Sequence, residues 1–98
     1  MKFDEYLRTQ HRTPRGRHLV SKSVQNYYGA ITGTITLWAN ENNIWQSNIV
    51  DITDVDTFRQ IKEKIERLPD FESQNSTGDS MYSCALNHYL EYLCFINK

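Results

Sequence analysis

The sequence of 98 residues lacks long apolar runs and has little cysteine, proline or glycine. No apolar run approaches the roughly 18 residues that a membrane span requires. The first ten residues, MKFDEYLRTQ, contain two acids and no apolar core of the signal-peptide type. Together with a net charge of −1 and 12% aromatic residues, these features predict one soluble, cytoplasmic domain spanning residues 1–98.

Cysteine is limited to Cys84 and Cys94, which both fall in the last predicted helix. Ten residues along a helix separate their Cα atoms by about 15 Å. A disulfide requires a separation below about 7 Å, so the two residues cannot bridge each other. We therefore expect two free, buried thiols in a reducing compartment.

Motifs for catalysis are also missing. The histidines at positions 11, 18 and 88 have no second ligand at metal spacing, and the C-x-x-C, H-E-x-x-H, P-loop and G-x-G-x-x-G patterns are absent. The acids of the DITDVD segment, Asp51, Asp54 and Asp56, leave an acidic metal site as an alternative. However, Asp54 also suits the N-cap of the next helix, and the ligand pattern of a calcium loop is absent. We predict no enzymatic activity, no cofactor and no metal.

The spacing of apolar residues predicts an all-α fold, a compact bundle of four main helices with short connectors. The predicted helices cover residues 2–10, 21–42, 54–68 and 80–97. The last is the longest, and Asp79 or Ser80 is expected to cap it. Its apolar face consists of Met81, Ala85, Leu86, Tyr89, Leu93 and Ile96.

The segment 29–38, GAITGTITLW, leaves a strand as an alternative, because its isoleucines and threonines alternate. Its glycines and threonines also lower helix propensity. We favour a helix, because the helical spacing of apolar residues continues through the segment and no second strand is available for pairing. The small residues Gly29, Ala30 and Gly33 would then mark the close approach of another helix.

Two connectors complete the predicted fold. Residues 44–53, IWQSNIVDIT, form a connector with room for a single helical turn near Ile49. Its anchors to the core are three apolar residues: Trp45, Ile49 and Ile52. Residues 69–79, PDFESQNSTGD, are predicted to be a long polar loop from which Phe71 points inward.

Charge is unevenly distributed along the chain. Residues 1–28 have six basic and two acidic residues, whereas residues 29–98 have five basic and ten acidic residues. Within the basic part, Pro14 and Gly16 stop any helix in the segment HRTPRGRHL. Such a loop can grip phosphates through its arginines, and the alternative is a solvated linker.

The helix that follows this basic loop offers further contacts for DNA. Backbone N–H groups in its first turn suit a phosphate, and the side-chain amides of Gln25 and Asn26 can read base edges. The alternative is that these polar residues merely face water. The predicted contacts to duplex DNA are Arg12, Arg15, Arg17, His18, Lys22, Gln25 and Asn26.

Several segments carry a resemblance that extends over most of the chain. They are the F-x-x-Y-L helix at 3–7, the basic linker, Ser23–Tyr28, the I-x-D-I-T-D connector and MYSCALNHYLEYL at 81–93. Together they resemble the small helical N-terminal domain ahead of nuclease domains in restriction endonucleases, including HNH types. The chain is more distantly similar to the core-binding domain of tyrosine recombinases. The resemblance implies DNA binding by the N-terminal module of a larger protein, with the nuclease motif beyond residue 98.

The acidic part of the chain supports a different hypothesis. In that case the chain is a protein–protein interaction or dimerisation module, or a small inhibitor of a nucleic-acid enzyme. Its working surface would be an acidic face that includes Glu63, Glu66, Asp70 and Glu72.

Overall fold

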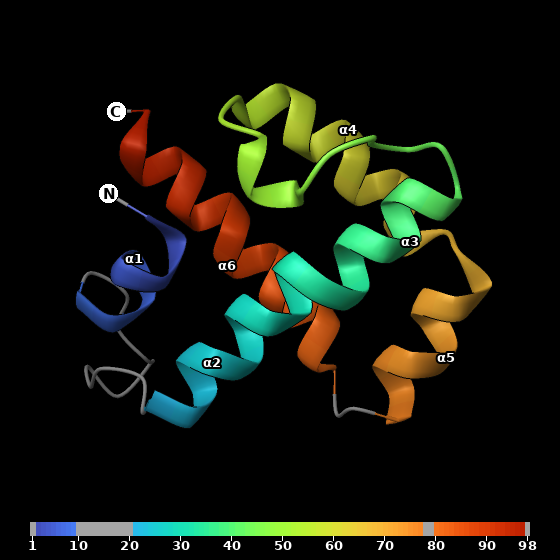
Figure 1. The fold of residues 1–98 in the computed structure, drawn as a ribbon, viewed down its shortest axis with the longest axis horizontal. Helices are drawn as coiled ribbons and strands as arrows, with labels where there is room; N and C mark the ends of the chain where they lie inside the picture. The colour runs from blue at the N-terminus through green and yellow to red at the C-terminus, as the bar shows by residue number, and fades with distance from the viewer. Residues whose placement is uncertain (1, 10–20, 78–79, 98) are drawn as a thin grey trace.

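The computed structural model describes residues 2–9, 21–77 and 80–97, and within these ranges every regular element is helical (Figure 1). This confirms the predicted all-α class for the described residues. In chain order, the elements are α1 (Phe3–Thr9), α2 (Ser21–Gly29), η1 (Ala30–Ile35), α3 (Thr36–Glu41), η2 (Ile49–Asp51), α4 (Val55–Glu66), α5 (Pro69–Thr77) and α6 (Met81–Ile96).

Helix α6 crosses the molecule between α1 and α2 on one side and α4 and α5 on the other (Figure 1). It packs against all four helices and against η1. The Tyr89 ring is fully buried at its centre, and the Tyr89 hydroxyl donates to the Ile52 carbonyl over 2.7 Å. Burial raises the pKa of Tyr89, so this hydroxyl stays protonated and keeps its hydrogen bond. Both cysteines are free, and Cys94 is exposed, so the prediction that it is buried is wrong.

Residues 21–41 form one continuous helical segment, which settles the alternative between helix and strand in favour of helix. Its central part, η1, has π-helical geometry. The Thr36 hydroxyl donates to the Ile31 carbonyl five residues earlier, over 2.7 Å, and accepts the Ile49 N–H over 3.1 Å. One threonine side chain therefore joins the π-helical turn to the connector between α3 and α4.

The two glycines of this segment do not mark a helix crossing. A Cβ atom built on Gly29 or Gly33 would have no neighbour within 4 Å, and both residues are exposed. The predicted close approach at these positions is therefore wrong, although Ala30 between them is buried.

The connector after α3 follows the prediction. Its single helical turn is the 3₁₀ element η2, and Ile49 and Ile52 are buried in the core. At its end, the Asp54 carboxylate accepts the Thr57 N–H and the Thr57 hydroxyl, each over 2.8 Å. These hydrogen bonds confirm Asp54 as the N-cap of α4, and they lower the pKa of its carboxyl group.

The predicted polar loop at 69–79 is wrong, because residues 69–77 form helix α5. Pro69 occupies the first helical position, where its missing N–H costs nothing. Asp70 and Glu72 follow in the first turn, where the helix dipole favours acids. Phe71 is buried as expected and packs edge-on against Trp38, with 6.2 Å between ring centroids.

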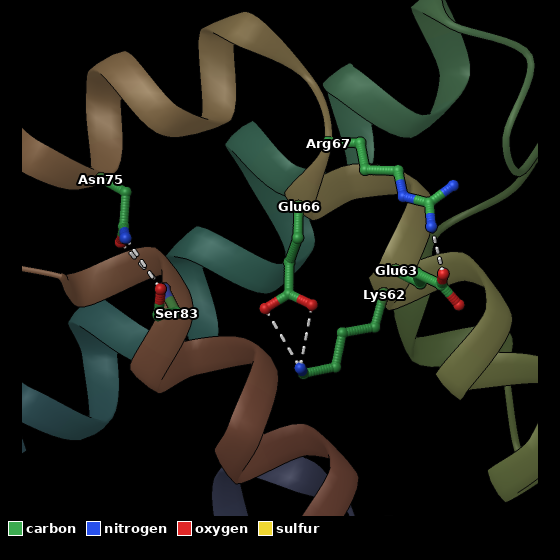
Figure 2. Close-up of polar contacts among 6 residues, drawn as sticks. All are labelled: Lys62, Glu63, Glu66, Arg67, Asn75 and Ser83. Atoms are coloured by element: carbon green, nitrogen blue, oxygen red, sulfur yellow. Dashed lines mark hydrogen bonds and ion pairs between the residues drawn. The ribbon is translucent and has the colours of Figure 1, made fainter.

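A side chain from α5 caps α6. Ser80 has a left-handed backbone and makes no capping bond with its side chain, so the expectation that it caps α6 is wrong. The alternative cap, Asp79, lies outside the described residues. Instead, the Asn75 carbonyl oxygen accepts the Ser83 N–H over 3.0 Å, and the Asn75 amide donates to the Ser83 hydroxyl over 2.7 Å (Figure 2).

Candidate nucleic-acid interface

Three of the predicted DNA contacts lie on the exposed side of α2. Lys22, Gln25 and Asn26 are all exposed, and their spacing of i, i+3 and i+4 places them on one helical face. Gly29 continues that face one turn later and is also exposed. We refer to Lys22, Gln25, Asn26 and Gly29 as the amide face. The other predicted contacts, Arg12, Arg15, Arg17 and His18, lie outside the described residues.

The opposite side of α2 holds the helix in place. Val24 is buried in the core, and the Tyr27 ring packs edge-on against the His88 ring of α6, with 4.6 Å between centroids. Burial raises the pKa of Tyr27, so its hydroxyl is neutral near pH 7. The amide face is therefore presented on a helix that is anchored on its other side.

Neither the amides of the amide face nor its lysine are used for internal contacts. Within the described ranges, no hydrogen bond or ion pair joins Lys22, Gln25 or Asn26 to another side chain. Gly29 gains no internal contact from its lack of a side chain either, although glycine inside a helix costs about 1 kcal/mol relative to alanine. The face thus carries donors and acceptors that the fold itself does not require.

The acids of α4 are mostly compensated by cations of the same helix. Glu63 lies 2.6 Å from Arg67, and both carboxylate oxygens of Glu66 lie 3.1 Å from the Lys62 ammonium (Figure 2). Of the four acids in the acidic-face hypothesis, these two therefore have partners. The other two, Asp70 and Glu72, lie in the first turn of α5.

The acids of the DITDVD segment serve three separate structural purposes. Asp54 caps α4, the Asp51 carboxylate accepts a hydrogen bond from the Ser47 hydroxyl, and Asp56 lies 4.0 Å from Arg59. Among the residues that the structure describes, no three His, Cys, Asp or Glu side chains are grouped to hold a metal ion.

One cavity of about 380 Å³ is lined in part by Tyr28 of α2, the helix that carries the amide face. It brings together residues from α2, α6, η2 and the start of the chain: Lys2, Phe3, Tyr28, Val50, Tyr89 and Tyr92. Sequence reasoning missed this group, because its members are spread over ninety positions and share no local spacing. The one available signal was Tyr28, an aromatic residue that comes two positions after the amides.

No helix in the described ranges is both long enough and apolar enough to cross a membrane. No known family, curated protein or solved structure matches this chain. Its function is therefore inferred from the exposed surfaces and the cavity of the described residues.

Proposed function

We propose that this chain is a DNA-binding module that contacts duplex DNA through the amide face of α2 and the basic segment ahead of it. The observation that carries the proposal is the shared exposure of Lys22, Gln25 and Asn26 on one anchored helix. A single α-helix fits the major groove of B-DNA, and Gln or Asn can pair with an adenine edge through two hydrogen bonds. A helix that exposes two such amides and no acid suits this task.

The positive charge of the segment ahead of α2 supports the same proposal. Arg12, Arg15, Arg17 and His18 precede α2 in the sequence, and we propose them, together with Lys22, as the phosphate contacts. Gly29 leaves the helix backbone open to close approach by a partner. In this proposal the arginines supply affinity through release of counterions, and the amides supply the preference for particular bases.

The proposal extends to the larger protein. By its resemblance to the N-terminal domains of restriction endonucleases, the chain is proposed to be the DNA-binding module of a cytoplasmic restriction-type protein, with a nuclease domain downstream. The alternative, an interaction or inhibitor module with an acidic face, has less support, because Glu63 and Glu66 are already paired.

The test is fluorescence anisotropy with a mixed-sequence duplex at about 50 and 200 mM salt. We expect binding that weakens steeply with salt and that is lost for all sequences when Arg15 and Arg17 are both changed to Glu. Lys22→Gln should lower the salt slope by about one, because one phosphate contact is removed. The matched control is Lys64→Gln, an exposed lysine on α4, which should leave binding unchanged.

Base reading is tested separately with the double variant Gln25→Ala and Asn26→Ala. The double variant should retain non-specific binding but lose its preference among sequences. Each lost base contact should remove about 1–3 kcal/mol of discrimination against the wrong base. Absence of any binding at low salt with micromolar protein would rule out the proposed function. In that case, a concentration-dependent mass in sedimentation would favour the interaction module.

A further inference from the structure

The cavity lined by Tyr28 has an aromatic interior and a rim with one aromatic and one charged side chain. Its inner rings, Phe3, Tyr89 and Tyr92, are almost fully buried. Tyr28, by contrast, is one of the few large apolar side chains exposed among the described residues, at 37%, and Lys2 is exposed as well. The interior is thus held by the core, while the rim presents one ring and one cation to solvent.

The rings are fixed by contacts with each other. Phe3 packs edge-on against Tyr89 with 5.0 Å between centroids, and lies 5.6 Å from Tyr92. The Phe3 and Tyr28 planes differ by only 30°, with 6.5 Å between centroids. Phe3 lies inside the cavity, so the exposed Tyr28 ring is the face that a flat ligand can reach at the rim, and a ring that is already packed loses little freedom on binding.

The Lys2 side of the rim is positively charged. No acid pairs with the Lys2 ammonium in the described ranges, and the nearby acid Asp4 lies 3.5 Å from Arg8. Burial raises the pKa of Tyr92, and the negative charges of Asp4 and Glu5 raise it further. A negative group on a ligand is therefore attracted to the Lys2 side of the cavity and repelled from the Tyr92 side.

We propose that this aromatic pocket binds a single nucleotide. The base stacks on the aromatic rim, and Lys2 holds the phosphate. A cavity of about 380 Å³ falls at the small end of ligand sites, and a base stacked on an aromatic ring gains affinity without reading its edge. The same chemistry is offered by a free mononucleotide and by an unpaired nucleotide in a DNA strand. The second source depends on the proposed function, since Tyr28 lies on the same helix as the amide face.

The first experiment titrates adenosine monophosphate into the labelled protein and follows backbone and tyrosine signals by NMR, with ribose 5-phosphate as the probe without a base. We expect the nucleotide, and not ribose phosphate, to shift signals of the pocket residues. Tyr28→Leu should weaken binding about five- to 100-fold, whereas Tyr28→Phe keeps the ring and the affinity. Lys2→Gln should weaken it several-fold, and the matched control Lys64→Gln should not. Equal binding by Tyr28→Leu and the unchanged protein overturns the proposal.

The second experiment compares a fully paired duplex with the same duplex carrying one extrahelical adenine, by anisotropy. Tighter binding of the second duplex, lost in Tyr28→Leu, supports the pocket with the DNA strand as its source, even if the free nucleotide does not bind. No binding of the nucleotide and no preference for the unpaired adenine overturns the pocket, whatever the paired duplex does. Nucleotide binding without binding of the paired duplex keeps the pocket and refutes the proposed function.

Discussion

Replacing Thr36 by valine tests the connection between the π-helical turn and the connector. Valine has nearly the same shape and the same branching at Cβ, so it keeps packing and helix propensity but removes the hydroxyl. The substitution removes the 2.7 Å bond to the Ile31 carbonyl and the 3.1 Å bond from the Ile49 N–H, together with a longer 3.4 Å contact to the Asn48 side-chain oxygen. Ile49 is fully buried, so its N–H would remain without a partner and without water.

A buried donor without a partner costs about 1–3 kcal/mol, and we expect Thr36→Val to lower the free energy of unfolding by about 2 kcal/mol. For a domain of this size, that loss lowers Tm by about 8–16 °C. Urea unfolding followed by circular dichroism, together with thermal melts, measures both quantities. Thr36→Ser keeps the hydroxyl and should therefore lower the free energy of unfolding by less than Thr36→Val does.

The matched control is Thr32→Val, one turn earlier in the same continuous helical segment, 21–41. The Thr32 hydroxyl donates to the Tyr28 carbonyl over 2.9 Å at an exposed site, where water can replace it. We expect Thr32→Val to change the free energy of unfolding by no more than about 0.5 kcal/mol. If Thr36→Val is as stable as Thr32→Val, the hydroxyl does not stabilise the π-helical turn and the reasoning fails.

Three further substitutions test other contacts. Asn75→Ala removes the cap of α6 and should cost about 1–2 kcal/mol in urea unfolding, whereas Asn75→Asp keeps an acceptor for the Ser83 N–H and should cost little; equal stability of the two variants would contradict the capping role. The pKa of Asp54 is lowered in the folded state, so its stabilising contribution is present above about pH 4 and is lost as pH falls below that value. The stability difference between Asp54→Ala and the unchanged protein should therefore shrink in melts below about pH 4, and a constant difference would refute this. Gly29→Ala should raise stability by about 1 kcal/mol, since the added methyl group meets open space, but should weaken DNA binding if the amide face approaches DNA closely; unchanged anisotropy would separate Gly29 from the interface.

The parts of the fold that follow from local spacing could be predicted. Apolar residues at helical intervals located α1, α4, α6 and the long segment at 21–41, and a carboxylate in the right place identified the Asp54 cap. The link from the end of the π-helical turn to the connector could not be predicted, because its hydrogen bond joins Thr36 to Ile49, thirteen residues apart. Local patterns carry no information about such a partner.

Helix α5 was missed for a related reason. Phe71 is its only buried residue, so no apolar periodicity is present. Short helices are unstable alone, and this one is held by the Trp38 ring and by the hydrogen bonds between Asn75 and Ser83. Both kinds of contact come from elsewhere in the chain, so propensity alone indicated a loop.

Only one part of the candidate site could be predicted from the sequence. Exposure of Lys22, Gln25 and Asn26 follows from their position opposite Val24 on a helix, which the sequence indicates directly. The aromatic pocket exists only after α1, η2 and α6 come together, and nothing near Lys2 or Val50 signals it.

The central position of α6 has a consequence for the order in which the molecule is made. The ribosome synthesises α6 after every helix that it contacts, and α1, which also packs against α2, meets α6 only after more than seventy further residues have been made. Until then, Phe3, Val24 and Phe58 have no complete core to enter, because each belongs to the same buried cluster as the α6 residues. Contacts this distant in sequence slow folding and leave apolar surface exposed in the meantime. This part of the chain is therefore most vulnerable to aggregation and proteolysis just before α6 emerges.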